Sequence, residues 1–217
     1  MPDKITRAVY EEAQKLVVRH QSYAHHLSES RKRRELRSGT PLPTNKEIKC
    51  PQYWACDKGF NPYHVRKQHE SIARAIKKSS ATGSYLPRPA VIHRIPKKGG
   101  GTRQISVFQV ADQAISRLIF DRLMAKNASR LNPKCYAYRK DKTIHDAVLN
   151  LARDIKGTDR IYVAEYDFRD FFSSICHDQV EKVLSDPRFY LTAREVKTVM
   201  GFLKAPRLQP SSPSEDY

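Results

Sequence analysis

Two aspartates that follow an apolar run are the residues of this chain best suited to metal-dependent chemistry. The segment 161–175 reads IYVAEYDFRDFFSSI, so a predicted strand over Ile161–Tyr166 ends directly before Asp167, and Asp170 follows among aromatic residues. A carboxylate at a strand end suits Mg2+ or Mn2+, because these cations prefer oxygen ligands. Such an ion can hold phosphate oxygens and activate a hydroxyl for nucleotidyl transfer. A helix N-cap is the other interpretation of an aspartate in this position, and the spacing leaves both open.

A basic hairpin is predicted upstream, over residues 90–108. Apolar residues lead into and out of the turn Pro-Lys-Lys-Gly-Gly-Gly at 96–101, and its three glycines predict a mobile tip. Four cations lie close to this turn, namely Arg94, Lys97, Lys98 and Arg103. The segment therefore places a cluster of positive charge on a flexible turn.

Helices account for most of the remaining elements. Apolar residues recur at helical spacing among charged ones, which predicts helices at 3–38, 62–78, 109–128, 143–156, 171–184 and 192–202. Thr143 and Asp146 have the spacing of a capping box at one of these starts. Residues 40–62 and 79–89 are predicted as connectors, and residues 204–217, with three prolines and three serines, as disordered. This mixture predicts an α+β fold.

The charge balance indicates a polyanionic partner. The 217 residues include 40 Lys and Arg against 23 Asp and Glu, a formal net charge of +17, and nucleic acid is the commonest partner of such a chain. No apolar run approaches the roughly 18 residues that span a bilayer. The charged N-terminus is unlike a signal peptide, so we expect a cytoplasmic protein without a membrane partner, with its four cysteines reduced. The basic cluster expected to bind nucleic acid is Arg31, Lys32, Arg33 and Arg34.

Two cysteines and two histidines raise the alternative of a zinc site. Cys50, Cys56, His64 and His69 follow the order Cys-x5-Cys-x7-His-x4-His. The cysteine spacing is wider than the usual two to four intervening residues, and histidines five apart share a helix face poorly. We therefore expect ordinary loop and helix residues here.

Several segments, in order along the chain, resemble one known family. Asp-x-x-Asp-Phe-Phe-x-Ser at 167–174 is similar to palm motif A of bacterial reverse transcriptases, particularly those of retrons, group II introns and defence systems. IPKKGGGTRQISVFQVADQAISRLI at 95–119 resembles the first fingers motif, and YAYRKDKTIHDAV at 136–148 resembles the second. FNPYHVRKQHESIARAI at 60–76 resembles the helix that precedes the fingers. The resemblance spans about residues 60–185.

The resemblance implies a role for each matching residue. Asp167 matches the first metal-binding aspartate, and the carbonyl group of Phe168 would add a second oxygen ligand for Mg2+ or Mn2+. Phe172 matches the aromatic gate that excludes a ribose 2'-hydroxyl. For Tyr138, near the template or the fingers–palm junction, a core position is the open alternative. The other implied contacts to the incoming nucleotide come from Lys97, Arg103 and the backbone around Asp170 and Phe171, and those to nucleic acid from Arg94, Lys98, Arg139 and His145.

The implied function is RNA-directed DNA synthesis dependent on Mg2+. Expected partners are an RNA template or structured non-coding RNA, an RNA–DNA duplex, dNTPs and a protein partner or oligomer, in a retroelement or phage-defence system. We expect a helical basic arm and loop at 1–59, which the resemblance does not cover, a fingers-like region at 60–160, a partial palm at 161–203 and a disordered tail at 204–217. The family's Tyr-x-Asp-Asp turn does not occur in this sequence. An N-terminal portion, a frameshifted product and a chain completed by another subunit all stay open, and the alternative function is a non-catalytic nucleic-acid-binding fragment or subunit.

Overall fold

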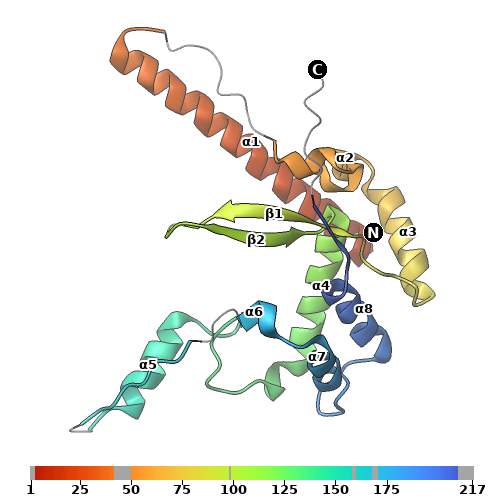
Figure 1. Cartoon of the computed structure of the whole chain (residues 1–217), viewed down its shortest axis with the longest axis vertical. Coiled ribbons are helices and arrows are strands. Elements are labelled where there is room, and N and C mark those ends of the chain that lie inside the picture. Colours follow the sequence, from red (N-terminus) through yellow and green to blue (C-terminus); the bar gives the residue numbers. More distant parts are fainter. Residues whose placement is uncertain (1–2, 42–49, 98, 158–159, 168–170, 210–217) are drawn as a thin grey trace. The chain divides into compact units, whose positions relative to one another are not determined.

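The computed structural model describes residues 3–41, 50–97, 99–157, 160–167 and 171–209, apart from the side chains of Phe172 and Ser173. The fold is α+β, as predicted, with helices and one small sheet (Figure 1). The chain divides into two compact units, one formed by residues 1–121 together with 193–217 and the other by residues 122–192. This division follows compactness, whereas the ranges predicted above follow motifs and stay predictions. No helix in the described part of the chain has the length and apolar character needed to cross a membrane.

The first unit begins with the long helix α1, Lys4–Ser38, close to its predicted bounds. The Asp3 side chain accepts a hydrogen bond from the backbone N–H of Thr6 and caps the helix start. Gly39 ends the helix in the left-handed conformation, with φ of 65°, which glycine adopts without steric cost. The buried residues of α1 recur every three or four positions in its N-terminal half and are Thr6, Val9, Ala13 and Val17.

The helix predicted at 62–78 is wrong in one respect, because the chain forms two helices there. Short 3-10 turns at Gln52–Ala55 (η1) and Lys58–Phe60 (η2) precede α2, Pro62–Lys67, and α3, His69–Ala81. His69 donates from Nδ1 to the carbonyl oxygen of Arg66, 2.8 Å away. This side chain takes up a backbone acceptor at the junction, which is one of the recognised causes of a helix break.

The predicted hairpin is confirmed and belongs to a three-stranded sheet. Strands β1, Ala90–Pro96, and β2, Thr102–Val107, pair antiparallel, with Val91 opposite Val107 and Pro96 opposite Thr102. A third strand, β3 at Arg207–Leu208, pairs parallel with β1, so the strand order is β2-β1-β3. The prediction that 204–217 is disordered is therefore wrong for β3, because the Pro206 carbonyl group accepts from Ala90 N–H at 2.9 Å. Residues 210–217 lie outside the described residues.

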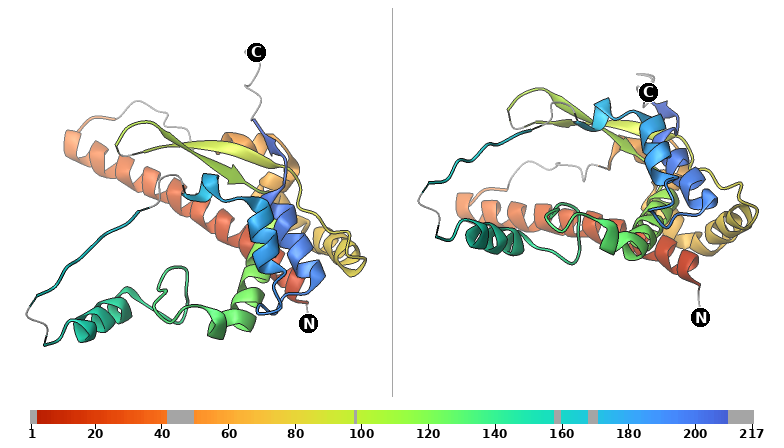
Figure 2. Two further views of the ribbon diagram at one scale, coloured as in Figure 1. Left: turned by 60° about the horizontal axis from the view of Figure 1, so that its bottom comes forward. Right: turned by 90° about the horizontal axis from the view of Figure 1, so that it is seen from below.

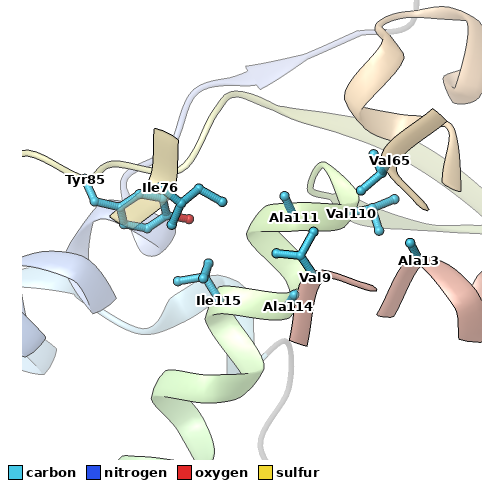
Figure 3. Close-up of a cluster of buried hydrophobic side chains, with 9 residues drawn as sticks. All are labelled: Val9, Ala13, Val65, Ile76, Tyr85, Val110, Ala111, Ala114 and Ile115. Carbon is cyan, nitrogen blue, oxygen red and sulfur yellow. The ribbon is translucent and has the colours of Figure 1, made fainter. Parts of the chain in front are cut away.

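The core of the first unit lies where α1, α2, α3 and α4 meet. Helix α4, Val110–Asn127, matches the prediction for 109–128, and its first turns face α1. Figure 3 shows the cluster, in which side chains from the four helices and from Tyr85 point toward one another. Its members are Val9, Ala13, Val65, Ile76, Tyr85, Val110, Ala111, Ala114 and Ile115.

Helix α8, Ala193–Leu203, completes the first unit and agrees with the prediction for 192–202. Its residues Val196 and Met200 are buried, and the ring of Phe202 meets the ring of Phe108 edge-on, with centroids 5.2 Å apart. These contacts attach the C-terminal segment to residues that directly precede α4.

The second unit contains η3, Ala128–Arg130, α5, Ile144–Asp154, α6, Phe171–Ser174, and α7, His177–Leu184. The helix predicted at 171–184 is thus interrupted, because Cys176 has the extended backbone angle ψ of 119°. The strand predicted at Ile161–Tyr166 is also wrong. A strand requires a neighbouring strand for its hydrogen bonds, and none of the described strands pairs with this segment.

Candidate nucleic-acid interface and catalytic segment

The β1–β2 hairpin ends in a tight turn held by two backbone hydrogen bonds. Lys97 N–H donates to the Gly101 carbonyl oxygen at 3.0 Å, and Gly100 N–H donates to the Lys97 carbonyl oxygen at 3.2 Å. Gly100 and Gly101 have φ of 90° and 76°, a region that glycine enters freely and other residues rarely adopt. Gly100 and Gly101 are therefore needed for the backbone geometry of the turn.

Three of the four predicted hairpin cations are described, and all three are exposed. Within the described part of the chain, Arg94, Lys97 and Arg103 form no ion pair. Arg103 lies opposite Ile95 and Arg94 opposite Gln104, so the two arginines occupy adjacent pairs and point to opposite faces of the ribbon. The hairpin thus offers positive charge from both faces.

Aromatic rings anchor the base of the hairpin to the core. The ring of His93 meets that of Tyr53 at 5.4 Å, and Tyr53 in turn meets Phe60, which is buried. Burial raises the pKa of the Tyr53 hydroxyl. Two residues after the end of β2, the side chain of Gln109 donates to the Asp57 carboxylate at 2.9 Å. The 3-10 turns between α1 and α2 therefore contact the middle of β1 and the residue pair that follows β2.

A buried carboxylate that sequence reasoning missed positions the connection into β1. The Tyr85 hydroxyl donates to one oxygen of Asp112 at 2.6 Å, and the Arg88 backbone N–H donates to the other at 3.1 Å. Burial raises the pKa of the Asp112 carboxyl group, which the hydrogen bond from Tyr85 partly offsets. Burial also raises the pKa of Tyr85. The only signal in the sequence is an acid in the first turn of helix α4, between the apolar residues Ala111 and Ala114.

The second fingers-like segment shows a paired arginine and an exposed histidine. Arg139 donates from Nε to Asp141 at 3.0 Å and from a terminal nitrogen at 2.5 Å, and this pairing lowers the pKa of the Asp141 carboxyl group. Tyr138 is exposed and has φ of 57°, which contradicts a core position. His145 is exposed in the first turn of α5.

The capping box predicted at the start of α5 is confirmed. The Asp146 backbone N–H donates to Thr143 Oγ1 at 3.3 Å, and the Thr143 backbone N–H donates to the Asp146 carboxylate at 2.7 Å. The hydrogen bonds from Thr143 lower the pKa of the Asp146 carboxyl group. The box fixes the first residue of the helix, and so the place of His145 within it.

The motif A segment is exposed where it is described. Tyr162, Val163 and Tyr166 are 92%, 88% and 88% exposed, and Asp167 is exposed as well. Phe171 starts α6 with 47% of its surface exposed. The predicted site residues Lys98, Phe168 and Asp170, and the side chain of Phe172, lie outside the described residues.

The described side chains do not assemble a metal site. Among them, no group of three or more His, Cys, Asp or Glu residues is arranged to hold an ion. Of the four residues in the zinc alternative, Cys50 lies near a histidine outside that set, with its Sγ 3.7 Å from Nε2 of His20. Nδ1 of the same ring lies 2.9 Å from the Tyr63 hydroxyl.

The predicted basic cluster lies on α1, and its four members differ in their partners. Arg31 pairs with Glu35 at 2.9 Å and Lys32 pairs with Glu29 at 3.1 Å, within the same helix. Arg33 and Arg34 are exposed.

Comparison of the sequence with models of protein families gives no match, and comparison with curated proteins gives none either.

Proposed function

We propose that this chain is the fingers region and the start of the palm of an RNA-directed DNA polymerase that uses Mg2+ or Mn2+. The observation that carries the proposal is the basic hairpin. Its cations Arg94, Lys97 and Arg103 are exposed and, among the described residues, without ion pairs, and α4 follows the hairpin directly. Exposed cations on a turn suit the phosphates of an incoming nucleotide, and the guanidinium of Arg103 can bond them bidentately.

The order of elements supports the same proposal. The hairpin and α4 are followed by the Tyr-x-Tyr-Arg segment, the capped helix α5 and the segment that carries Asp167. This is the order that the resemblance to bacterial reverse transcriptases implies, for retrons, group II introns and phage-defence systems alike. Template, primer and dNTP are then the expected ligands.

The metal donors of the chain fit one half of a two-metal site. Asp167 and the carbonyl group of Phe168 would supply oxygen ligands, whereas the sequence contains no Tyr-x-Asp-Asp turn to supply a further carboxylate. Nucleotidyl transfer by two metals needs ligands for both ions. We therefore propose that the chain alone binds a primed template and extends it poorly.

Primer extension on three proteins tests this proposal. These are the chain itself, the chain joined to a palm segment with a Tyr-x-Asp-Asp turn, and the joined protein with Asp167→Asn. We expect extension only by the joined protein, because asparagine keeps the shape of aspartate but removes the charge that holds a divalent cation. Robust extension by the Asp167→Asn protein would remove Asp167 from the site.

Sugar selection provides a second readout of the same site. In the joined protein, Phe172→Ala should raise incorporation of ribonucleotides and leave the Mg2+ dependence of extension unchanged, because the proposed gate acts by steric exclusion. Leu184→Ala, a change in α7 outside motif A, is the control. An unchanged preference for dNTPs in Phe172→Ala would contradict the assignment of the gate.

The second candidate function is a nucleic-acid-binding fragment or subunit without catalysis. The exposed cations and the single matched carboxylate favour it over a complete polymerase. If the joined protein binds a primed template but incorporates no nucleotide under any divalent cation, this candidate replaces the first.

A further inference from the structure

The C-terminal half of α1 continues beyond the residues that bury it. Val17 is the last buried residue of the helix, and Val18–Ser38, called the arm from here on, follows without a break. Figures 1 and 2 show the arm extending away from α2, α3 and the start of α4. At 1.5 Å per residue, the arm is about 31 Å long. A helix that extends this far past its core must have another reason for its length.

Four exposed arginines lie on one face of the arm. Arg33 and Arg37 are one turn apart, and Arg34 and Arg37 are three residues apart, which are spacings that share a helix face. Arg19 and Arg37 are separated by about five full turns at 3.6 residues per turn, so they also face the same way. Arg33, Arg34 and Arg37 thus lie within about one turn near the C-terminal end of the arm, and Arg19 lies about 21 Å from Arg33 along the same face.

Within the described part of the chain, these arginines form no ion pair or side-chain hydrogen bond. Glu29 lies one turn from Arg33, and its pKa is lowered first by the hydrogen bond from Lys32 and also by the charge of Arg33. The acids Glu29 and Glu35 pair with Lys32 and Arg31, as described above. The arm therefore presents a one-sided row of positive charge to its surroundings.

We propose that the arm binds the phosphate backbone of duplex RNA. A cluster of three guanidinium groups and a fourth about 21 Å away on the same face of one straight helix can contact phosphates at separate points along a rigid duplex. Single strands are usually held in grooves with several stacking aromatic rings, and Tyr23 is the one Phe, Tyr or Trp among the described residues of the arm. The choice of RNA over DNA rests on the proposed function, whereas the inference that the arm binds a duplex phosphate backbone does not depend on it.

An anionic membrane fits this face less well. Helices that bind a lipid surface carry a broad apolar face beside their cations. Here the positions between the arginines on this face are Ser22, Tyr23, His26 and Ser30, of which only Tyr23 carries a large apolar surface. The broad apolar face needed for insertion is missing beside these arginines.

Ring contacts connect the arm to the hairpin within one compact unit. His20 on the arm meets Trp54 of η1 at 5.0 Å, and the neighbouring Tyr53 meets His93 of β1 at 5.4 Å. A duplex bound along the arm would therefore be held by the same unit that carries the hairpin cations. The arm gives this unit a second nucleic-acid contact, separate from the one proposed for the nucleotide.

Charge reversal with a matched control tests the inference. Arg33→Glu/Arg34→Glu/Arg37→Glu in the full chain is compared with Lys67→Glu/Arg74→Glu/Lys78→Glu, which makes the same charge change at exposed sites of α2 and α3. The probe is a blunt 20-base-pair RNA duplex, with binding measured by fluorescence anisotropy across salt concentrations. Three lost phosphate contacts should lower the slope of log affinity against log salt by about 2.7. The control variant should keep most of the slope of the unchanged chain.

A lysine variant keeps the result interpretable if the triple glutamate protein misfolds. Arg33→Lys/Arg34→Lys/Arg37→Lys retains the charge and should keep most of the salt slope, whereas Arg33→Gln/Arg34→Gln/Arg37→Gln should lower it by about 2.7, as the glutamate variant does. Equal slopes in the arm and control variants would overturn the inference. Tighter binding of the arm to single-stranded RNA, or to vesicles of phosphatidylserine and phosphatidylcholine, than to the duplex would also overturn it. Primer extension by the joined protein on a short template is a separate readout, because it tests Asp167 and not the arm.

Discussion

Removing one hydroxyl group, by Tyr85→Phe, should destabilise the first unit in a manner that depends on pH. The lost hydrogen bond runs from the Tyr85 hydroxyl to the buried Asp112 carboxylate at 2.6 Å, and the backbone N–H of Arg88 is then the remaining described donor to that carboxylate. A hydrogen bond to a charged group contributes about 1.5–3 kcal/mol, so we expect a loss of about 2 kcal/mol at pH 7.5. For a chain of this size, that corresponds to a Tm decrease of about 4–8 °C.

The pH dependence follows from the raised pKa of Asp112. Burial disfavours the charged carboxylate, so the stability linked to this group is fully present below its unfolded pKa of about 3.9 and is lost as pH rises through the folded pKa. Tyr85→Phe removes a bond that favours the charged form, and therefore raises the pKa of Asp112 further. Because the pKa is raised, a larger share of the group is protonated near pH 4 than at pH 7.5, so the mutation should cost less there, approaching about 1 kcal/mol as for a neutral hydrogen bond.

Urea unfolding at pH 4 and pH 7.5 measures both values. Tyr162→Phe is the control, because Tyr162 is 92% exposed and its change should alter the free energy of unfolding by less than about 0.5 kcal/mol. The same loss at both pH values, or a loss at pH 7.5 no larger than that of the control, would refute the reasoning about the buried carboxylate.

Two further predictions concern close packing and an ion pair. A Cβ atom at Gly59 would clash with Oε1 of the buried Gln109, so Gly59→Ala should lower the free energy of unfolding by about 1–3 kcal/mol in urea melts. Gly99→Ala, with open space around it, should change this free energy little. The hydrogen bond from Lys77 lowers the pKa of Asp3 to about 2, so this pair stabilises the fold above pH 4 and the effect is lost as pH falls toward 2. Asp3→Asn should flatten the acid side of the stability profile, and an unchanged profile between pH 4 and pH 2 would contradict the pairing.

Local patterns predicted the elements that depend on local interactions. The helices α1, α4 and α8 follow apolar residues at helical spacing, and the hairpin follows alternation around a glycine turn. The break at Gln68 was missed because it depends on one side chain, His69, which bonds to the backbone. Strand β3 was missed because a two-residue strand has no pattern of its own and exists only through its pairing with β1.

The sequence predicted which charged residues the candidate site contains, but not the strand pairing and ion pairs around them. Residue types identified the hairpin cations, and the structure places Arg94 and Arg103 on opposite faces, which requires the strand register. Apolar residues predicted a strand before Asp167, but that strand needs a hydrogen-bonding neighbour, which no local pattern reveals. The sequence shows the cluster at Arg31–Arg34. Only the structure shows that Arg31 pairs with Glu35 and Lys32 with Glu29.

The pairing of β3 with β1 has a consequence for synthesis on the ribosome. The hydrogen bond from Ala90 to Pro206 joins residues about 116 positions apart, and the whole second unit is translated between them. At about 5–20 residues per second, β3 is synthesised roughly 6–23 s after β1. The hairpin can form early, since its strands are adjacent, but one edge of β1 stays open during that interval. Translation rate across the intervening segment therefore sets how long this edge is exposed to pairing with other nascent chains.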